Sequence, residues 1–221
     1  MTRAWKTLAT ASTSEGTLEL RRRDDSDWLL VIGGRVLMSS TAGRSEEALA
    51  TRAIDRLAGR PTPRILIGGL GMGITLRAAL DAAPPDARIT VVELNAAVVD
   101  WCRGPLAPLT GGAALDPRVV IETRDVAEWL VHAAADSLDA ILLDLYEGPN
   151  AATQRDDDPF FGTRALAHMH SILRSRSVLA IWSEDADPPF SRRLAAAGFD
   201  VSVHREGRGG RRHLVYLGTR R

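Results

Sequence analysis

The chain has 221 residues, a length that suits one domain or one domain with a small addition. Lys plus Arg and Asp plus Glu both number 28, so the formal net charge is zero, which argues against a general nucleic-acid coat and against binding to acidic membranes. The one cysteine, Cys102, excludes an intrachain disulfide and a cysteine-based zinc site, and we predict no metal site. The first residues lack the apolar core of a signal peptide and no run of 18 apolar residues occurs, so we expect a cytoplasmic protein without a membrane span.

The N-terminal part of the chain predicts a small β region over residues 1–45. Its strand-like runs are 17–22, 28–32 and 35–39, and Gly33 and Gly34 form a hairpin turn between the last two. A helix is expected over residues 46–60. Because so small a sheet is unstable alone, we expect it to pack on the rest of the chain or on a second copy, giving a homodimer.

From residue 64 onward, strands and helices alternate. The predicted strands are 64–69, 87–94, 118–123, 138–145 and 178–183. The predicted helices between and after them are 73–82, 95–103, 125–135, 161–173 and 189–197. Two final strands, 199–205 and 212–218, are joined by a turn of sequence EGRGG, so the last strand should be antiparallel. The pattern predicts an α/β Rossmann-like domain over residues 46–221 with a mostly parallel sheet.

The strongest functional signal is a glycine-rich turn, ILIGGLGMG, between the first of these strands and its helix. Glycines allow a tight turn, and the helix that follows offers free backbone amides to a ligand. The glycines Gly69, Gly71 and Gly73 form a G-x-G-x-G pattern, because Ile74 stands where the dinucleotide fingerprint has its third glycine. This pattern is more typical of nucleosides that carry a sulfonium.

Acidic residues follow at the ends of the next strands. Glu93 ends the second strand, where a carboxylate can accept hydrogen bonds from both ribose hydroxyls, and Leu94 beside it belongs to the same predicted nucleoside site. Asp125 and Val126 follow the third strand, where a carboxylate can accept the adenine amino group and a backbone amide can meet a ring nitrogen. Asp125 also fits a helix N-cap. Asp144 ends the fourth strand, so all these residues should meet at one edge of the sheet.

The run from ILIGGLGMG through VVEL, DPRVVIETRDVAEWL and DAILLDLYEGPN to PFF resembles the spermidine synthase-like aminopropyltransferases. The resemblance covers roughly residues 30–185. It implies a small N-terminal β-domain followed by a class I Rossmann sheet of the S-adenosylmethionine (AdoMet) methyltransferase type, and a homodimer.

The sequence departs from the family's motifs at three places. Gly71 stands where the family has an aspartate that holds the amine of decarboxylated AdoMet. The segment after the fourth strand is DLYEGP, shorter than the family's, and keeps Asp144 with Tyr146 and Glu147 as candidate substrate contacts. Of the family's tyrosine–histidine–glutamate segment, we expect Glu47 to survive as a substrate ligand.

Three functions follow. The favoured one is methyl transfer from AdoMet to a small amine-type acceptor, because without the loop aspartate the carboxylate of AdoMet meets no like charge there. The second is aminopropyl transfer from decarboxylated AdoMet, and the third is nucleoside binding without catalysis. In either transfer Asp144 is the predicted general base, ionised at neutral pH beside the sulfonium.

Overall fold

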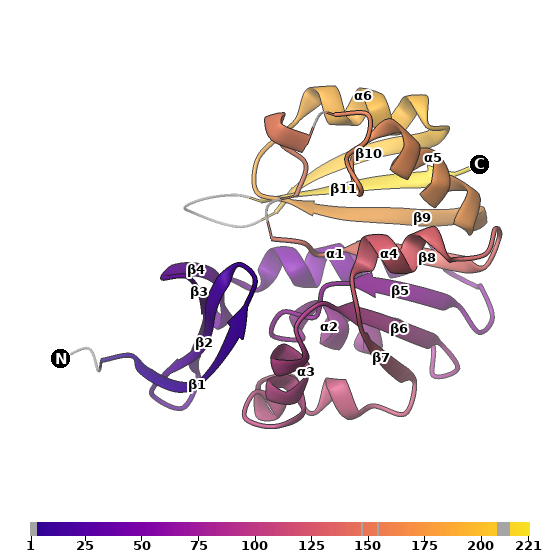
Figure 1. Ribbon diagram of the computed structural model, residues 1–221. Helices are drawn as coiled ribbons and strands as arrows, with labels where there is room; N and C mark the ends of the chain where they lie inside the picture. The colour runs from indigo at the N-terminus through magenta and orange to yellow at the C-terminus, as the bar shows by residue number, and fades with distance from the viewer. Residues whose placement is uncertain (1–3, 147, 154, 207–212) are drawn as a thin grey trace.

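The computed structural model describes residues 4–146, 148–153, 155–206 and 213–221. A four-stranded antiparallel sheet of order β1-β2-β3-β4 comes first and stands beside a seven-stranded sheet of order β10-β11-β9-β8-β5-β6-β7 (Figure 1). Strands β5 to β9 pair in parallel, and β11 runs antiparallel to both β9 and β10. The predicted fold class is therefore confirmed, including its antiparallel last strand.

The strands of the small sheet are β1 Lys6–Thr13, β2 Gly16–Arg23, β3 Asp27–Ile32 and β4 Arg35–Ser39. Those of the large sheet are β5 Arg64–Gly68, β6 Arg88–Glu93, β7 Val119–Thr123, β8 Leu138–Leu143, β9 Leu173–Ser183, β10 Phe199–Glu206 and β11 His213–Arg220. The α-helices are α1 Arg44–Asp55, α2 Ile74–Ala82, α3 Ala96–Arg103, α4 Val126–Val131, α5 Thr163–Ile172 and α6 Pro188–Ala196. The 3₁₀ turns are η1 Ser40–Ala42, η2 Ala107–Thr110, η3 Ala113–Leu115 and η4 Ala151–Thr153.

The structure differs from the predicted elements at a few places. Strand β1 was not predicted, because KTLATAST holds mostly small and polar residues and its side chains are largely exposed. Helix α1 ends at Asp55 and α4 at Val131, both earlier than predicted, whereas β9 starts five residues before its predicted strand. The EGRGG turn lies mostly outside the described residues.

The large sheet is covered on both faces. Alternate residues of its strands point to opposite sides, so Ile65 and Ile67 join one hydrophobic cluster and Leu66 the other. The first cluster includes buried side chains of α1, α2 and α3, and the second those of α4, α5 and α6. Leu18, Leu20 and Trp28 of the small sheet also belong to the first cluster, so this sheet buries its apolar face within the chain.

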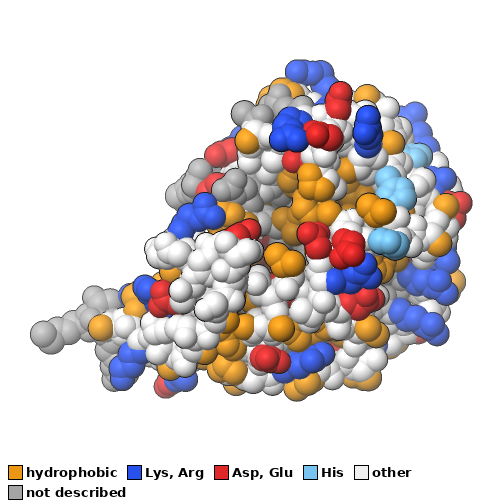
Figure 2. All heavy atoms as spheres, viewed as in Figure 1, with side chains coloured by type: hydrophobic (Ala, Val, Ile, Leu, Met, Phe, Trp, Pro, Cys, Tyr) orange, Lys and Arg blue, Asp and Glu red, His pale blue; other side chains and the backbone are white. Residues whose placement is uncertain are grey.

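The molecular surface agrees with the balanced composition. On the face drawn in Figure 2, acidic and basic side chains are interspersed with hydrophobic and uncharged ones. Within the part of the chain that the structure describes, no helix is both long and apolar enough to cross a bilayer.

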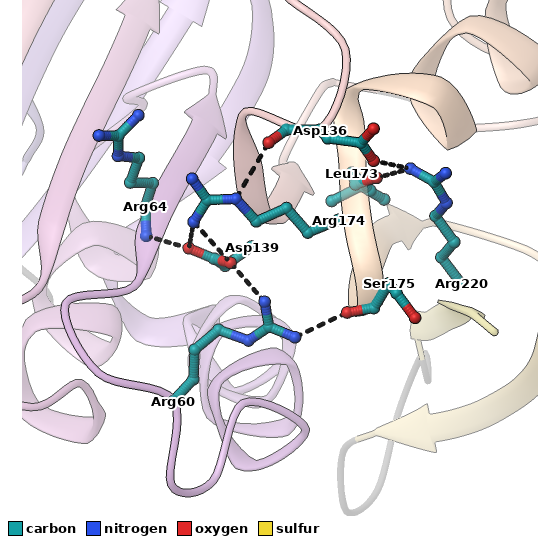
Figure 3. Close-up of polar contacts among 8 residues, drawn as sticks. All are labelled: Arg60, Arg64, Asp136, Asp139, Leu173, Arg174, Ser175 and Arg220. Carbon is teal, nitrogen blue, oxygen red and sulfur yellow. Dashed lines mark hydrogen bonds and ion pairs between the residues drawn. The ribbon is translucent and has the colours of Figure 1, made fainter.

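A buried carboxylate ties strands together at the amino-terminal edge of the parallel sheet. Asp139 of β8 has a fully buried side chain and accepts hydrogen bonds from Arg60 Nη1 at 2.7 Å, Arg174 Nη1 at 3.2 Å and the backbone N–H of Arg64 at 2.7 Å (Figure 3). Arg60 also donates to the carbonyl of Ser175 at 2.7 Å. The cluster therefore joins the segment after α1 to β5, β8 and β9, at the opposite end of β8 from Asp144.

We predict that Asp139→Asn lowers the free energy of unfolding by about 2–4 kcal/mol, because one partner of a buried ion pair is neutralised while the guanidinium groups remain. The matched control is Asp136→Asn, whose carboxylate is 63% exposed and pairs with Arg220 at the same edge. That change should cost less than about 1 kcal/mol. Urea denaturation of both variants measures the difference, and equal costs would contradict the structural role of Asp139.

Candidate active site

A cavity of about 510 Å³ lies between the small sheet and the carboxyl-terminal ends of the parallel strands. Its apolar wall includes side chains from β2, β3 and β4 of the small sheet, namely Leu18, Leu30, Ile32, Leu37 and Met38. Its other walls come from the glycine loop, the residues that follow β6, β7 and β8, and the segment before α5. The predicted edge of the sheet is therefore where the cavity lies.

The glycine loop comes close to two other parts of the chain. Gly69 has φ of +87°, and a Cβ there would lie 2.5 Å from the carbonyl oxygen of Asp144, so this position requires glycine. A Cβ at Gly71 would lie 2.9 Å from Met38 Sδ, which also accepts the backbone N–H of Met72 at 3.3 Å. Gly69 and Gly71 line the cavity, whereas Gly73 precedes α2 outside its lining.

Glu93 is buried, and both of its carboxylate oxygens accept backbone hydrogen bonds. Oε2 accepts the N–H of Leu70 at 2.9 Å, and Oε1 accepts the N–H of Asn95 at 2.8 Å. The side chain thus fixes the glycine loop to the end of β6. Each oxygen has a second lone pair, so the carboxylate can accept further hydrogen bonds from a ligand in the cavity that it lines.

The residues after β6 and β7 complete this half of the cavity. Leu94 is 55% exposed and lines it, as do Asp125 and Val126. Asp125 Oδ1 accepts the N–H of Ala127 at 2.7 Å and caps α4, as one interpretation of the sequence expected. The cap uses one carboxylate oxygen and leaves Asp125 at the cavity wall, where a ligand can reach the other.

Two acidic residues, Asp144 and Glu46, stand together on the opposite side. Asp144 Oδ2 accepts the hydroxyl of Thr75 at 2.6 Å. Burial and the nearby charge of Glu46 raise the pKa of Asp144 to about 7, against the lowering effect of the Thr75 hydrogen bond. In this ligand-free state Asp144 is therefore partly protonated at neutral pH, which differs from the expectation of full ionisation made for the sulfonium-bound state.

Glu46, rather than its neighbour Glu47, faces the cavity. Glu46 is buried on the side of α1 that also buries Leu49, Ala50 and Ala53, whereas Glu47 is exposed and lines a separate groove with Arg44 and Arg77. The spacing of 46, 49, 50 and 53 along a helix is a signal in the sequence that could have identified Glu46.

The two candidate substrate contacts after Asp144 have different outcomes. Tyr146 lines the cavity, is 42% exposed, and lies under the guanidinium of Arg35 at 4.4 Å from the ring centre. Glu147 lies outside the described residues. Trp182 of β9 also lines the cavity.

The cavity is acidic. Five carboxylate side chains line it, and among its described lining residues none is Lys, Arg or His; the acids are Glu15, Glu46, Glu93, Asp125 and Asp144. No group of three or more His, Cys, Asp or Glu residues in the described part of the chain has the arrangement of a metal site. The arrangement favours cationic organic ligands that carry an apolar part and several hydrogen-bond donors.

We predict that Asp144→Asn stabilises the ligand-free protein at alkaline pH. A carboxyl whose folded pKa of about 7 exceeds its ordinary 3.8 binds more protons in the native than in the unfolded state between these values, so stability falls as pH rises through that window. The melting temperature of the wild type should fall between pH 5 and pH 8, and that of the variant should fall less. At pH 8 the variant should melt a few degrees higher, since about 1 kcal/mol corresponds to roughly 2–4 °C. Scanning calorimetry of both proteins decides this, and a less stable variant at pH 8 would refute it.

We predict that Glu93→Gln weakens binding of methylthioadenosine about 10- to 100-fold and lowers stability by about 1–3 kcal/mol. The reason is that the amide N–H₂ of Gln would face the backbone N–H of Leu70 or Asn95, and two donors cannot bond to each other. Glu122→Gln, a half-buried carboxylate of β7 that lies 3.9 Å from Arg124 and outside the cavity lining, is the matched control and should change neither property. Isothermal calorimetry measures the affinity. Unchanged affinity in Glu93→Gln would remove Glu93 from the nucleoside site.

Comparisons with known proteins agree with this architecture. No protein-family model matches the chain. A curated polyamine aminopropyltransferase of Corynebacterium efficiens is 39% identical over 109 residues, which are 48% of this chain and 20% of the relative, so the match spans about a fifth of that protein.

Among solved structures, the spermidine synthase from Thermotoga maritima matches with a TM-score of 0.78 and 18% identity, over 97% of this chain and 72% of the other. A spermidine synthase in complex with the transition-state analogue AdoDATO matches with a TM-score of 0.76 and 18% identity, over the same shares of both chains. A probable spermidine synthase from Corynebacterium glutamicum matches with a TM-score of 0.68 and 22% identity, over 96% of this chain and 79% of the other. The resemblance inferred from the motifs is confirmed at the level of the fold: the chain has the spermidine synthase fold.

Proposed function

We propose that this protein transfers an aminopropyl group from decarboxylated AdoMet to a small primary amine. The observation that carries the proposal is the charge of the cavity, five carboxylates with no cationic side chain among its described lining residues. Both reactants of this reaction are cations without a carboxylate. The names of the curated relative and of the solved structures support the same chemistry.

The donor nucleoside fits the half of the cavity formed by the glycine loop and by β6 and β7. Glu93 is placed to accept the ribose hydroxyls, and Asp125 and the backbone of Val126 to meet the adenine. Gly69 and Gly71 carry no side chain and line the cavity, so their backbone can lie close to the sulfonium end of the donor. When bound, the donor supplies an electrophilic carbon next to a sulfonium, a leaving group that needs no protonation.

Methyl transfer from AdoMet, which the sequence favoured, has less support. AdoMet carries a carboxylate, and an anion in this cavity would face several like charges with no arginine or lysine among the described lining residues to pair with. Gly71 removes one aspartate of the family pattern, but Glu46 and Asp144 keep negative charge nearby. The summed charge therefore outweighs the single loop position.

Asp144 is the proposed general base. The acceptor binds as an ammonium beside the Asp144 and Glu46 carboxylates, and Asp144 takes one proton from its nitrogen. The free nitrogen lone pair then forms a C–N bond to the aminopropyl carbon as the C–S bond breaks, and the sulfur leaves as neutral methylthioadenosine. Positioning both reactants in one cavity supplies much of the rate.

A homodimer and a cytoplasmic location remain predictions. The small sheet already packs into the core of its own chain, so its stability does not require a second copy. Light scattering at micromolar concentration tests the dimer.

We predict that the wild-type protein releases methylthioadenosine from decarboxylated AdoMet when given short diamines, and that it binds decarboxylated AdoMet more tightly than AdoMet. Asp144→Asn keeps the hydrogen bond from Thr75 but removes the base, so its turnover should fall about 10²–10⁴-fold with little change in methylthioadenosine affinity. Chromatography of the nucleoside product and calorimetry with the three ligands measure these effects. Methylated amines formed from AdoMet would establish the methyltransferase instead, and nucleoside binding without turnover would establish a non-catalytic protein.

A further inference from the structure

A hydrogen-bonded chain of three side chains leads from β11 to the acidic half of the cavity. His213 Nδ1 lies 3.1 Å from Ser45 Oγ, and Ser45 Oγ donates to Glu46 Oε2 at 2.6 Å. Ser45 and Glu46 are both buried, at 4% and 7% exposure, and lie in the first turn of helix α1. These hydrogen bonds thus connect Ser45 with His213, which lies 168 positions further along the sequence.

The charge of Glu46 decides the direction of these hydrogen bonds. When Glu46 is ionised it can only accept, so Ser45 gives its one hydroxyl proton to Glu46 and the Ser45 oxygen accepts from His213. His213 therefore carries a proton on Nδ1, and both donors point toward the Glu46 carboxylate. Such an arrangement favours the anionic form of Glu46.

His213 is itself held from the side of the cavity. The ring of Trp182 meets that of His213 edge to face, with centres 4.8 Å apart and planes at 69°. Trp182 lines the cavity, so His213 contacts the back of one wall. His213 lies opposite Glu206 in the register of β11 with β10, and the Glu206 carboxylate binds Arg52 of α1 at 2.6 Å.

We propose that His213 is a positioning residue, which acts through Ser45 to fix the Glu46 carboxylate as an anion beside the bound acceptor amine. The proposal rests on the proposed function, since it assigns the second carboxylate of the acidic pair to the acceptor cation. Among the described residues, the charged and titratable groups whose charge acts on Glu46 are His213, Asp144 and Glu47.

The titration of Glu46 agrees with this arrangement. Burial raises the pKa of Glu46, while the hydrogen bond from Ser45 and the charge of His213 lower it, and Glu47 raises it further. Loss of Ser45 or of His213 should therefore favour the protonated, uncharged form of Glu46.

The first test needs no substrate. Carboxyl ¹³C NMR of glutamate-labelled protein follows the titration of Glu46, which Glu46→Gln assigns. Ser45→Ala and His213→Phe should raise the Glu46 midpoint by roughly 0.5–1 pH unit, and His213→Asn, which keeps a donor near Nδ1, should restore most of the difference. The control is His204→Phe on β10, whose imidazole bonds Ser202 instead. An unchanged or lower midpoint in Ser45→Ala and His213→Phe overturns the proposal.

The second test separates positioning of the acceptor from general damage to the fold. His213→Phe should raise KM for the acceptor about 3- to 10-fold, with kcat changed less and with methylthioadenosine affinity unchanged. An unchanged KM, or equal losses of acceptor and nucleoside binding, contradicts the proposal. If wild type turns over no amine, the proposed function fails, whereas the Glu46 titration still decides whether His213 fixes this carboxylate.

Discussion

The position of the glycine loop depends on one buried carboxylate. Glu93 accepts a backbone N–H from the loop with one oxygen and a backbone N–H from the residue after β6 with the other, so a single side chain joins two strand ends. With the loop held there, Gly69 lies against the carbonyl of Asp144, and the N–H of Asp144 donates to the carbonyl of Gly68 at 2.9 Å. The backbone of Gly69 and Gly71 therefore forms part of the cavity wall, and a side chain at Gly69 would force the strand ends apart.

The acids at the two ends of β8, Asp139 and Asp144, differ in how their charges are compensated. Asp139 at the amino end is compensated by two arginines and a backbone N–H, which makes it part of the scaffold. Asp144 after the carboxyl end accepts a neutral hydroxyl and has the like charge of Glu46 beside it. Strain between like charges costs stability, and proteins keep such arrangements chiefly where a ligand relieves them. A cationic ligand would compensate the charge of Asp144 and Glu46, as the arginines compensate that of Asp139.

Much of this arrangement follows from the sequence, because parallel strands buried on both faces leave continuous apolar runs and end at one edge. The glycine turn and the acids Glu93, Asp125 and Asp144 were placed at the cavity from such runs alone. The choice between Glu46 and Glu47 depends instead on the rotation of α1 about its axis, which a motif alignment does not contain. Strand β1 was missed since its small, exposed residues leave no alternating pattern. His213 could not have been found, because only the closing of β11 onto β9 brings it to Ser45.

The cavity favours a different transfer reaction from the one that the glycine motif favoured. The expectation of methyl transfer depended on one position, Gly71, where the lack of the family's aspartate predicts that a carboxylate-bearing donor is admitted. In the structure, Met38 Sδ lies 2.9 Å from where a Cβ at Gly71 would stand, so an apolar thioether from β4, and not a positive charge, adjoins the position of the missing aspartate. An anionic group on the donor would gain no partner from that exchange, while the remaining acids still repel it. The departure at Gly71 would thus change how the amine of the proposed donor is held, without changing the sign of charge that the acidic lining favours.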